Sequence, residues 1–182
     1  MLTIDIRTQN QYIKSHMVDS IFIGYTGGDF KYWINCVVPN TTTIFKVIAD
    51  KNMIIGAKSL LHKLGYSNFT FITDRTLLIQ KLKNISPYTL LQDIEHHKII
   101  DVREKNETEK IRLKSSINLP LSEIVSGAVP YGDVPFYIYC VGGYRSVIAM
   151  SILNNKISSE LININGGIKA IMKAPNFTEK IF

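Results

Sequence analysis

The residues best suited to chemistry lie in one stretch, between Cys140 and Arg145. The residues before it, 136–139 (FYIY), are typical of a buried strand, and the apolar residues within 147–153 recur at helical spacing. The glycine pair at 142–143 allows a tight loop between the two elements. The stretch therefore predicts a cysteine on a loop that joins the end of a strand to the beginning of a helix.

A cysteine at this place would be favoured as a thiolate. The N–H groups of such a loop point inward, and the helix dipole and the guanidinium of Arg145 add positive potential. These interactions stabilise a thiolate relative to a thiol, and the same loop would stabilise an anion carried on the sulfur. The alternative is an inert cysteine at a strand end, because free cysteine is often buried. The glycine pair and the arginine five positions further on favour the reactive cysteine.

The composition indicates a globular protein of one ordinary domain or two small ones. The chain has 182 residues, of which 46% are hydrophobic and 20% charged, and its net charge is +6. We expect no membrane span and no signal peptide, so a cytoplasmic location is the default. The two cysteines, Cys36 and Cys140, are too few for a disulfide framework. The Lys and Arg residues are dispersed, which argues against nucleic-acid binding, although a positive field would favour small anionic substrates.

Strand and helix patterns follow the same order twice along the chain, which predicts an α/β fold with parallel sheets flanked by helices. Residues 4–24 resemble residues 100–120, and Asp5-Ile6-Arg7 matches Asp101-Val102-Arg103. This internal similarity predicts a first domain over 1–73, a linker over 74–86 and a second domain over 87–182. The expected strands are 2–5, 20–24, 44–49, 69–72, 98–101, 117–119, 136–139 and 159–164, and the expected helices, besides the one after Cys140, are 8–16, 53–64, 89–95, 121–126 and 168–172.

The second repeat resembles the rhodanese family of sulfurtransferases. The residues that carry the resemblance are DVRE (101–104), INLPLSEI (117–124), YCVGGYRS (139–146) and INGGIKAI (164–171). The first repeat is similar to a degenerate rhodanese domain through its DIRT, SHMVDSIFIG and HKLGYSNF segments. The tandem pair resembles the C-terminal part of bacterial proteins that begin with a metallo-β-lactamase-fold, persulfide-dioxygenase-like domain. Since the chain has no HxHxDH zinc-binding cluster, such a partner domain would lie outside it, and the first repeat would be truncated at its N-terminus.

The resemblance implies covalent catalysis by Cys140, which would take the outer sulfur of thiosulfate or of a low-molecular-weight persulfide and pass it to a thiol or to cyanide. Arg145 would close the loop by pairing near Asp101 and Arg103, and an ion pair that holds the loop shut is as good an explanation of Arg145 as contact with the substrate. No metal or organic cofactor is expected. The partners would be a small anionic sulfur donor and a thiol acceptor. The expected substrate-binding residues are Val141, Gly142, Gly143, Tyr144, Arg145 and Ser146.

Two other functions remain open. Phosphatases related to this layout place five residues between the cysteine and the arginine, whereas four separate Cys140 from Arg145, and the shorter loop favours sulfur over phosphate. A non-enzymatic docking or regulatory module is the alternative from another class.

Two departures from the family pattern bear on the donor. Arg112 stands where the family often has a histidine, and the loop contains no basic residue before Arg145. A less charged or bulkier persulfide donor is therefore plausible. Tyr144 would either shield the sulfur or simply pack.

The first repeat is expected to be inert. Its corresponding loop places Ala49 and Asp50 near the nucleophile position and lacks a closing arginine, and neither side chain can accept a sulfur atom. Its expected role is to pack against the active half. His16 is expected to be structural, Cys36 to be a buried or incidental thiol, and the His96–His97 pair to hold no metal, because no further ligands accompany it at suitable spacing. The aromatic residues Phe30, Tyr32 and Trp33 are expected to form a packed cluster.

Overall fold

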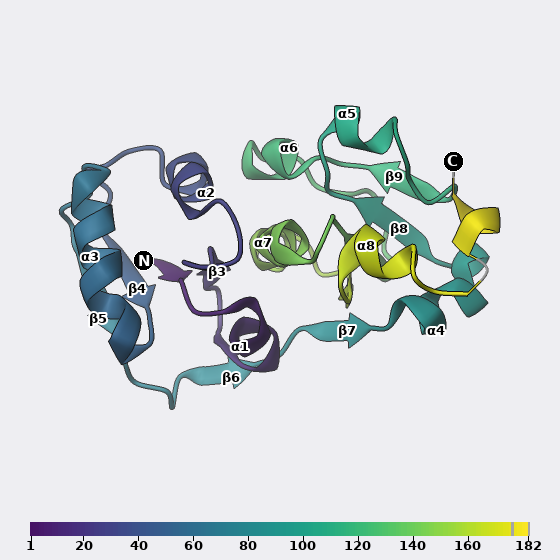
Figure 1. The fold of residues 1–182 in the computed structure, drawn as a ribbon. Helices are drawn as coiled ribbons and strands as arrows, with labels where there is room; N and C mark the ends of the chain where they lie inside the picture. Colours follow the sequence, from purple (N-terminus) through teal and green to yellow (C-terminus); the bar gives the residue numbers. More distant parts are fainter. Residues whose placement is uncertain (176, 182) are drawn as a thin grey trace. The chain divides into compact units, whose positions relative to one another are not determined.

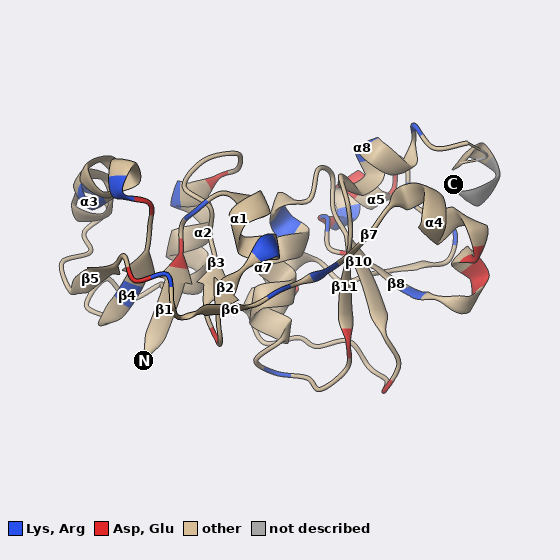
Figure 2. Cartoon of the chain, turned by 90° about the horizontal axis from the view of Figure 1, so that it is seen from below, with Lys and Arg blue, Asp and Glu red and all other residues tan. Residues whose placement is uncertain are grey.

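Two separate sheets of parallel strands organise the chain, one in each of two units, Met1–Lys81 and Leu82–Phe182 (Figure 1). The computed structural model describes residues 1–175 and 177–181. In both units helices alternate with the strands, so the predicted α/β fold with parallel sheets flanked by helices is confirmed. No helix in these described ranges is long and apolar enough to cross a membrane. Figure 2 shows Lys and Arg on many elements of both units.

The first unit is built on a four-stranded sheet in the order β3-β1-β4-β5. All neighbouring strands are parallel, and the register pairs Ile4 of β1 with Ile21 of β3 and with Val47 of β4. A short antiparallel ribbon of β2 and β6 accompanies the sheet. The elements are β1 (Leu2–Asp5), α1 (Gln9–Lys14), β2 (His16–Met17), β3 (Ile21–Phe22), α2 (Phe30–Val37), β4 (Phe45–Ile48), a 3₁₀ turn (Lys51–Met53), α3 (Ile54–Lys63), β5 (Phe69–Ile72) and β6 (Leu78–Gln80).

The second unit is built on a five-stranded parallel sheet in the order β7-β11-β10-β8-β9. In space α4 lies beside α8, and α6 lies beside α7 (Figure 1). Leu90 of α4 and Ile168 of α8 pack with Ile99 and Tyr139 of the sheet in one buried cluster. The elements are β7 (Lys83–Ile85), α4 (Pro87–Gln92), a 3₁₀ turn (Ile94–His96), β8 (Lys98–Asp101), α5 (Lys105–Thr108), β9 (Ser116–Asn118), α6 (Leu121–Val125), β10 (Phe136–Tyr139), α7 (Tyr144–Leu153), β11 (Leu161–Ile164), α8 (Gly167–Ile171) and a 3₁₀ turn (Phe177–Lys180).

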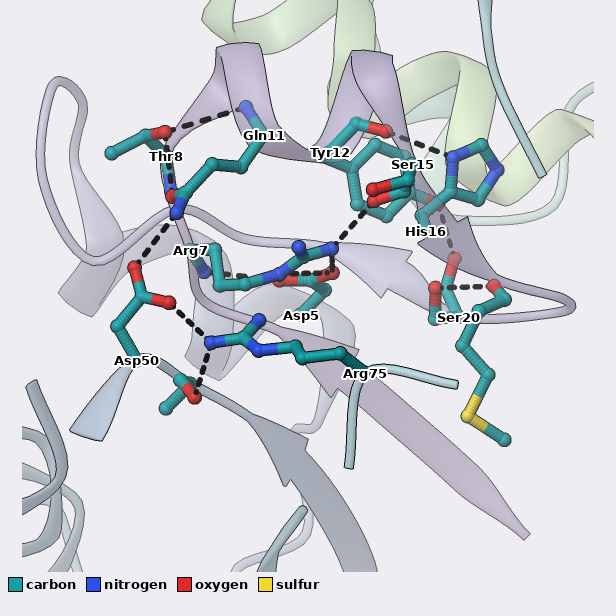
Figure 3. A network of polar contacts seen from close by, with 12 residues as sticks. Asp5, Arg7, Thr8, Gln11, Tyr12, Ser15, His16, Ser20, Asp50 and Arg75 are labelled. Atoms are coloured by element: carbon teal, nitrogen blue, oxygen red, sulfur yellow. Dashed lines mark hydrogen bonds and ion pairs between the residues drawn. The ribbon is translucent and has the colours of Figure 1, made fainter. Parts of the chain in front are cut away.

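The two units share one strand order. The order β3-β1-β4-β5 of the first corresponds to β9-β8-β10-β11 of the second, and β7 is an additional edge strand. The polar turn that follows β1 in the first unit recurs after β8 in the second. Arg7 donates from its side chain to both oxygens of Asp5 and, over 2.7 Å, to the carbonyl of Ser15 (Figure 3), as Arg103 does to Asp101 and, over 2.7 Å, to the carbonyl of Ile111.

The segment 74–86, expected to be a linker, contains two strands. Residues 78–80 form β6 and pair with β2 of the first unit, while residues 83–85 form β7 and pair with β11 of the second. Each strand is short and partly polar, so it lacks the apolar alternation by which strands are predicted. Backbone pairing with a neighbouring strand, rather than side-chain burial, stabilises these two strands.

Helix α2 was not predicted, although its residues were expected to form an aromatic cluster. Asp29 accepts a hydrogen bond from the N–H of Tyr32 and caps the helix, and Phe30 and Trp33 are buried on its inner face. Tyr32 is 52% exposed, so it lies at the edge of the expected aromatic cluster rather than in its interior. Its ring still contacts Trp33 edge to face, with centroids 4.8 Å apart.

His16 is buried and structural, as expected. Its ring stacks on Tyr12 with centroids 4.2 Å apart, and its Nδ1 lies 2.9 Å from the carbonyl oxygen of Tyr12. Burial lowers the pKa of His16 below its ordinary value of 6.5. Since the unfolded chain then binds a proton that the folded chain does not, stability should fall as the pH drops through about 6.5.

We therefore expect His16→Phe, which keeps the stacking on Tyr12, to flatten the pH dependence of stability below pH 6.5. The wild type should lose free energy of unfolding with a limiting slope of about 1.4 kcal/mol per pH unit from this group. Urea titrations between neutral and mildly acidic pH measure the slope. Equal slopes in the two proteins would contradict this account of His16.

Candidate active site

Cys140 follows β10 directly and lies at the carboxyl end of a central strand of the second sheet. Its side chain is buried, with 1% of its surface exposed. Helix α7 begins at Tyr144, and Gly143 precedes it with a φ of +108°, a conformation that glycine adopts without strain. The predicted sequence of strand, cysteine loop and helix is therefore present.

The sulfur of Cys140 contacts backbone and hydroxyl groups of the same loop. The N–H of Gly143 donates to Sγ over 3.2 Å, and Oγ of Ser146 lies 3.9 Å from Sγ. Both groups belong to the beginning of α7, where the helix dipole is positive. The N–H of Gly143 would donate to an anion on the sulfur, so this side of the geometry suits a thiolate or an anionic persulfide. The hydroxyl of Ser146 instead accepts from the thiol, because its own proton is directed to Gly143 or Asn163.

A polar layer behind the sulfur orients Ser146. Its hydroxyl lies 2.8 Å from both the carbonyl oxygen of Gly143 and Oδ1 of Asn163, which is buried in β11. Nδ2 of Asn163 donates over 2.7 Å to Oδ1 of Asn84 on the additional strand β7, and this bond sets the orientation of the Asn163 amide. Sequence reasoning missed both asparagines. The signal for Asn163 was a polar residue inside the otherwise apolar strand Leu161–Ile164.

Helix α8 holds the backbone of the cysteine loop from outside. The N–H of Ile168 donates over 2.8 Å to the carbonyl of Cys140, and the N–H of Lys169 donates over 3.2 Å to that of Val141. Gly167 makes this approach possible, since a Cβ there would lie 2.3 Å from the carbonyl oxygen of Cys140. These two carbonyls are thus engaged by α8, while the N–H of Gly143 in the same loop donates to the sulfur.

Arg145 pairs with Glu107 of α5 and not with Asp101, but Glu107 lies close enough to Arg103 to interact with its charge, so the pairing is in the expected neighbourhood. Nη1 and Nη2 of Arg145 lie 2.5 and 2.8 Å from the two carboxylate oxygens of Glu107. Both oxygens of Asp101 are instead taken by Arg103, whose position two residues further on allows the bonds to form within one turn. Sequence reasoning did not single out Glu107, although its spacing from Glu104 is that of a capping box.

Asp101 and Arg103 support the site indirectly. Arg103 spans the segment that follows β8, because it bonds to Asp101 at the beginning of that segment and to the carbonyl of Ile111 near its end. Helix α5, which carries Glu107, lies between these two points. The pair therefore braces the segment that presents Glu107 to Arg145.

The other residues singled out in the sequence lie as follows. Val141 and Tyr144 are half-buried and Gly142 is exposed, so these loop residues border the surface. Arg112 is exposed on the segment that follows α5. Cys36 is half-buried on α2 of the first unit. Across the described residues, no group of three or more His, Cys, Asp or Glu could hold a metal ion.

The loop of the first unit that corresponds to the cysteine loop carries different side chains. Ile48 pairs with Asp5 as Tyr139 pairs with Asp101, which places Ala49 at the position of Cys140. Asp50 binds Arg75 and accepts a hydrogen bond of 2.9 Å from Gln11 (Figure 3). The first unit thus has the methyl group of Ala49 at the nucleophile position, and the next residue of its loop, Asp50, is paired with Arg75.

Comparisons with known proteins find a family match in the second unit. Residues 86–174, just under half of the chain, match the family model described as a rhodanese-like domain. An uncharacterized protein of Bacillus subtilis, YqhL, is 36% identical over 72 residues, which are 39% of this chain and 57% of that protein. The chain therefore spans little more than half the length of this relative.

Solved structures of rhodanese-related proteins are also similar. A rhodanese-related protein from Thermoplasma volcanium is 26% identical, with a TM-score of 0.47 over 50% of this chain and 91% of that one. A thiosulfate sulfurtransferase from Pseudomonas aeruginosa is 18% identical, with a TM-score of 0.41 over 94% of this chain and 39% of that one.

We expect Gly167→Ala to destabilise the second unit by at least about 2 kcal/mol, because the new Cβ would meet the carbonyl of Cys140 and the positive φ of +59° disfavours alanine. Gly142→Ala is the matched control, since no atom lies within 4 Å of a Cβ added there. Urea denaturation of both variants measures the difference. Equal stabilities would show that α8 does not approach the loop as closely as described.

Proposed function

We propose that this protein is a sulfurtransferase that carries a sulfane sulfur on Cys140 as a persulfide. The observation that carries the proposal is the contact of the Cys140 sulfur with the backbone nitrogen of Gly143, 3.2 Å away at the beginning of α7, within a segment that matches the rhodanese-like domain. The donor is thiosulfate or a low-molecular-weight persulfide, and the acceptor is a thiol or cyanide. We place the reaction in the cytoplasm, where free thiols stay reduced.

The reaction consists of two sulfur exchanges. First, the thiolate of Cys140 attacks the outer sulfur of the donor; a bond forms between the two sulfurs, and sulfite or a thiolate leaves with the electron pair of the broken bond. Second, the acceptor attacks the outer sulfur of the persulfide, and Cys140 leaves as a thiolate. Electrons balance within each exchange, so the chemistry requires no external oxidant or reductant.

The residues of the loop have distinct parts in this scheme. The N–H of Gly143 donates to the sulfur of Cys140. In this scheme the outer sulfur of the persulfide is surrounded by the other loop N–H groups, those of Val141, Gly142, Tyr144, Arg145 and Ser146. Ser146, oriented by Asn163, offers its oxygen to the thiol proton before ionisation. Arg145 ties the loop to α5 through Glu107 rather than reaching for the substrate with both of its terminal nitrogens.

A non-enzymatic docking or regulatory module is the second candidate. The burial of Cys140, which is 1% exposed, favours it, because an inert cysteine is commonly buried. A cysteine-dependent phosphatase is a weaker third candidate, because only four residues separate Cys140 from Arg145.

Mass spectrometry of the intact protein after treatment with thiosulfate or glutathione persulfide tests the proposal. We expect an adduct of about 32 Da, one sulfur atom, on Cys140. The adduct should disappear when a thiol acceptor or cyanide is added, and it should be absent from Cys140→Ser.

Cys36→Ser is the matched control, because it removes the other cysteine and leaves the loop intact; it should still form the adduct. A folded wild-type protein that gains no sulfur from either donor would favour the docking module. Hydrolysis of an aryl phosphate that depends on Cys140 would favour the phosphatase.

A further inference from the structure

The only cation of the 140–146 loop is engaged by a carboxylate. Arg145 uses Nη1 and Nη2 to bind both oxygens of Glu107, at 2.5 and 2.8 Å, in a bidentate pair. The pair is shielded, since 20% of the Arg145 side chain and 32% of the Glu107 side chain are exposed. The hydrogen bonds from Arg145 lower the pKa of Glu107, so the carboxylate stays charged at neutral pH.

A second carboxylate adds to this negative charge. The N–H of Glu104 donates over 3.1 Å to Glu107, and Oε2 of Glu104 accepts a bond of 3.1 Å from Ser122. Glu104 lies close enough to Arg145 to interact with its charge, as Cys140 does. The guanidinium of Arg145 is therefore bonded to one carboxylate and lies near a second.

Two basic residues that flank Glu104 are themselves paired with carboxylates. Arg103 is neutralised by Asp101, and Lys105 points to Glu123 on α6, with 3.4 Å between the charged atoms. A donor approaching the sulfur would thus meet N–H groups but, on the α5 side, no net positive charge.

From this arrangement, and on the premise of the proposed sulfur transfer, we propose that Glu107 sets the choice of donor. By neutralising Arg145, Glu107 disfavours a dianion such as thiosulfate, whose charged sulfonate is bonded directly to the sulfur that is transferred. It leaves the site open to an organic persulfide, which carries at most one charge at its reacting end. The exchange balances as before: the outer sulfur bonds to Cys140, and the organic thiolate leaves with the electron pair.

Glu107→Gln is the informative variant. The glutamine oxygen can still accept a bond from Arg145 and from the N–H of Glu104, while the negative charge is lost. We expect kcat/KM for thiosulfate to rise about tenfold and kcat/KM for glutathione persulfide to change by less than about threefold. Glu104→Gln, which leaves the ion pair with Arg145 in place, should change the ratio in the same direction by a smaller factor.

Glu160→Gln is the matched control for net charge. Glu160 precedes β11 at the end of the sheet opposite to Cys140 and pairs with Lys83, so its loss should leave the donor ratio unchanged. Thermal denaturation of each variant verifies that it is folded.

The outcomes separate the two proposals. If the wild type transfers sulfur through Cys140 and Glu107→Gln does not change the donor ratio, the role of Glu107 is wrong and the sulfurtransferase stands. If the wild type prefers thiosulfate, the role of Glu107 is likewise wrong. If no Cys140-dependent transfer occurs with either donor, the proposed function fails and the role of Glu107 fails with it.

Discussion

The buried pair of Asp101 and Arg103 is the interaction on which the arrangement of the site depends. Both side chains are removed from water, which is costly for charged groups unless every donor and acceptor is matched. Here the guanidinium spans both carboxylate oxygens and the carbonyl of Ile111, and the backbone N–H of Arg103 also donates to Asp101. Such a pair contributes less to stability than to geometry. It fixes one path for the chain after β8, and that path carries Glu107 to Arg145.

The first unit shows that this frame, the shared strand order with its buried Asp–Arg pair, forms without a cysteine in the loop. Asp5 and Arg7 repeat the same bonds, and the strand order is shared, yet the loop after β4 begins with Ala49 and is held by Asp50 and Arg75. The frame therefore positions whatever loop follows the central strand. The second unit differs by its cysteine, by the close approach of α8 at Gly167, and by the strand β7, whose Asn84 orients the polar layer behind the sulfur.

Sequence patterns predicted most of the longer elements and the place of the cysteine loop, because these depend on apolar periodicity, glycine and the repeat itself. They failed for elements that tertiary pairing stabilises. Strands β6 and β7 are short and partly polar, and α5 has only four residues, held by the reciprocal bonds of Glu104 and Glu107. Helix α2 was not predicted, because its aromatic residues indicated a packed cluster but did not show a helical spacing.

The same distinction applies to the site. The loop from Cys140 to Ser146 is one continuous segment, so its motif shows which groups surround the sulfur. The net charge near the sulfur depends on two segments of the chain, the cysteine loop and α5. Glu107 of α5 lies 38 residues from Arg145 along the chain and pairs with it. No pattern within the loop reveals that Arg145 is already neutralised. The loop motif by itself therefore supports the proposed sulfur transfer, whereas the proposed choice of donor rests on the side chain that faces the loop arginine from another element.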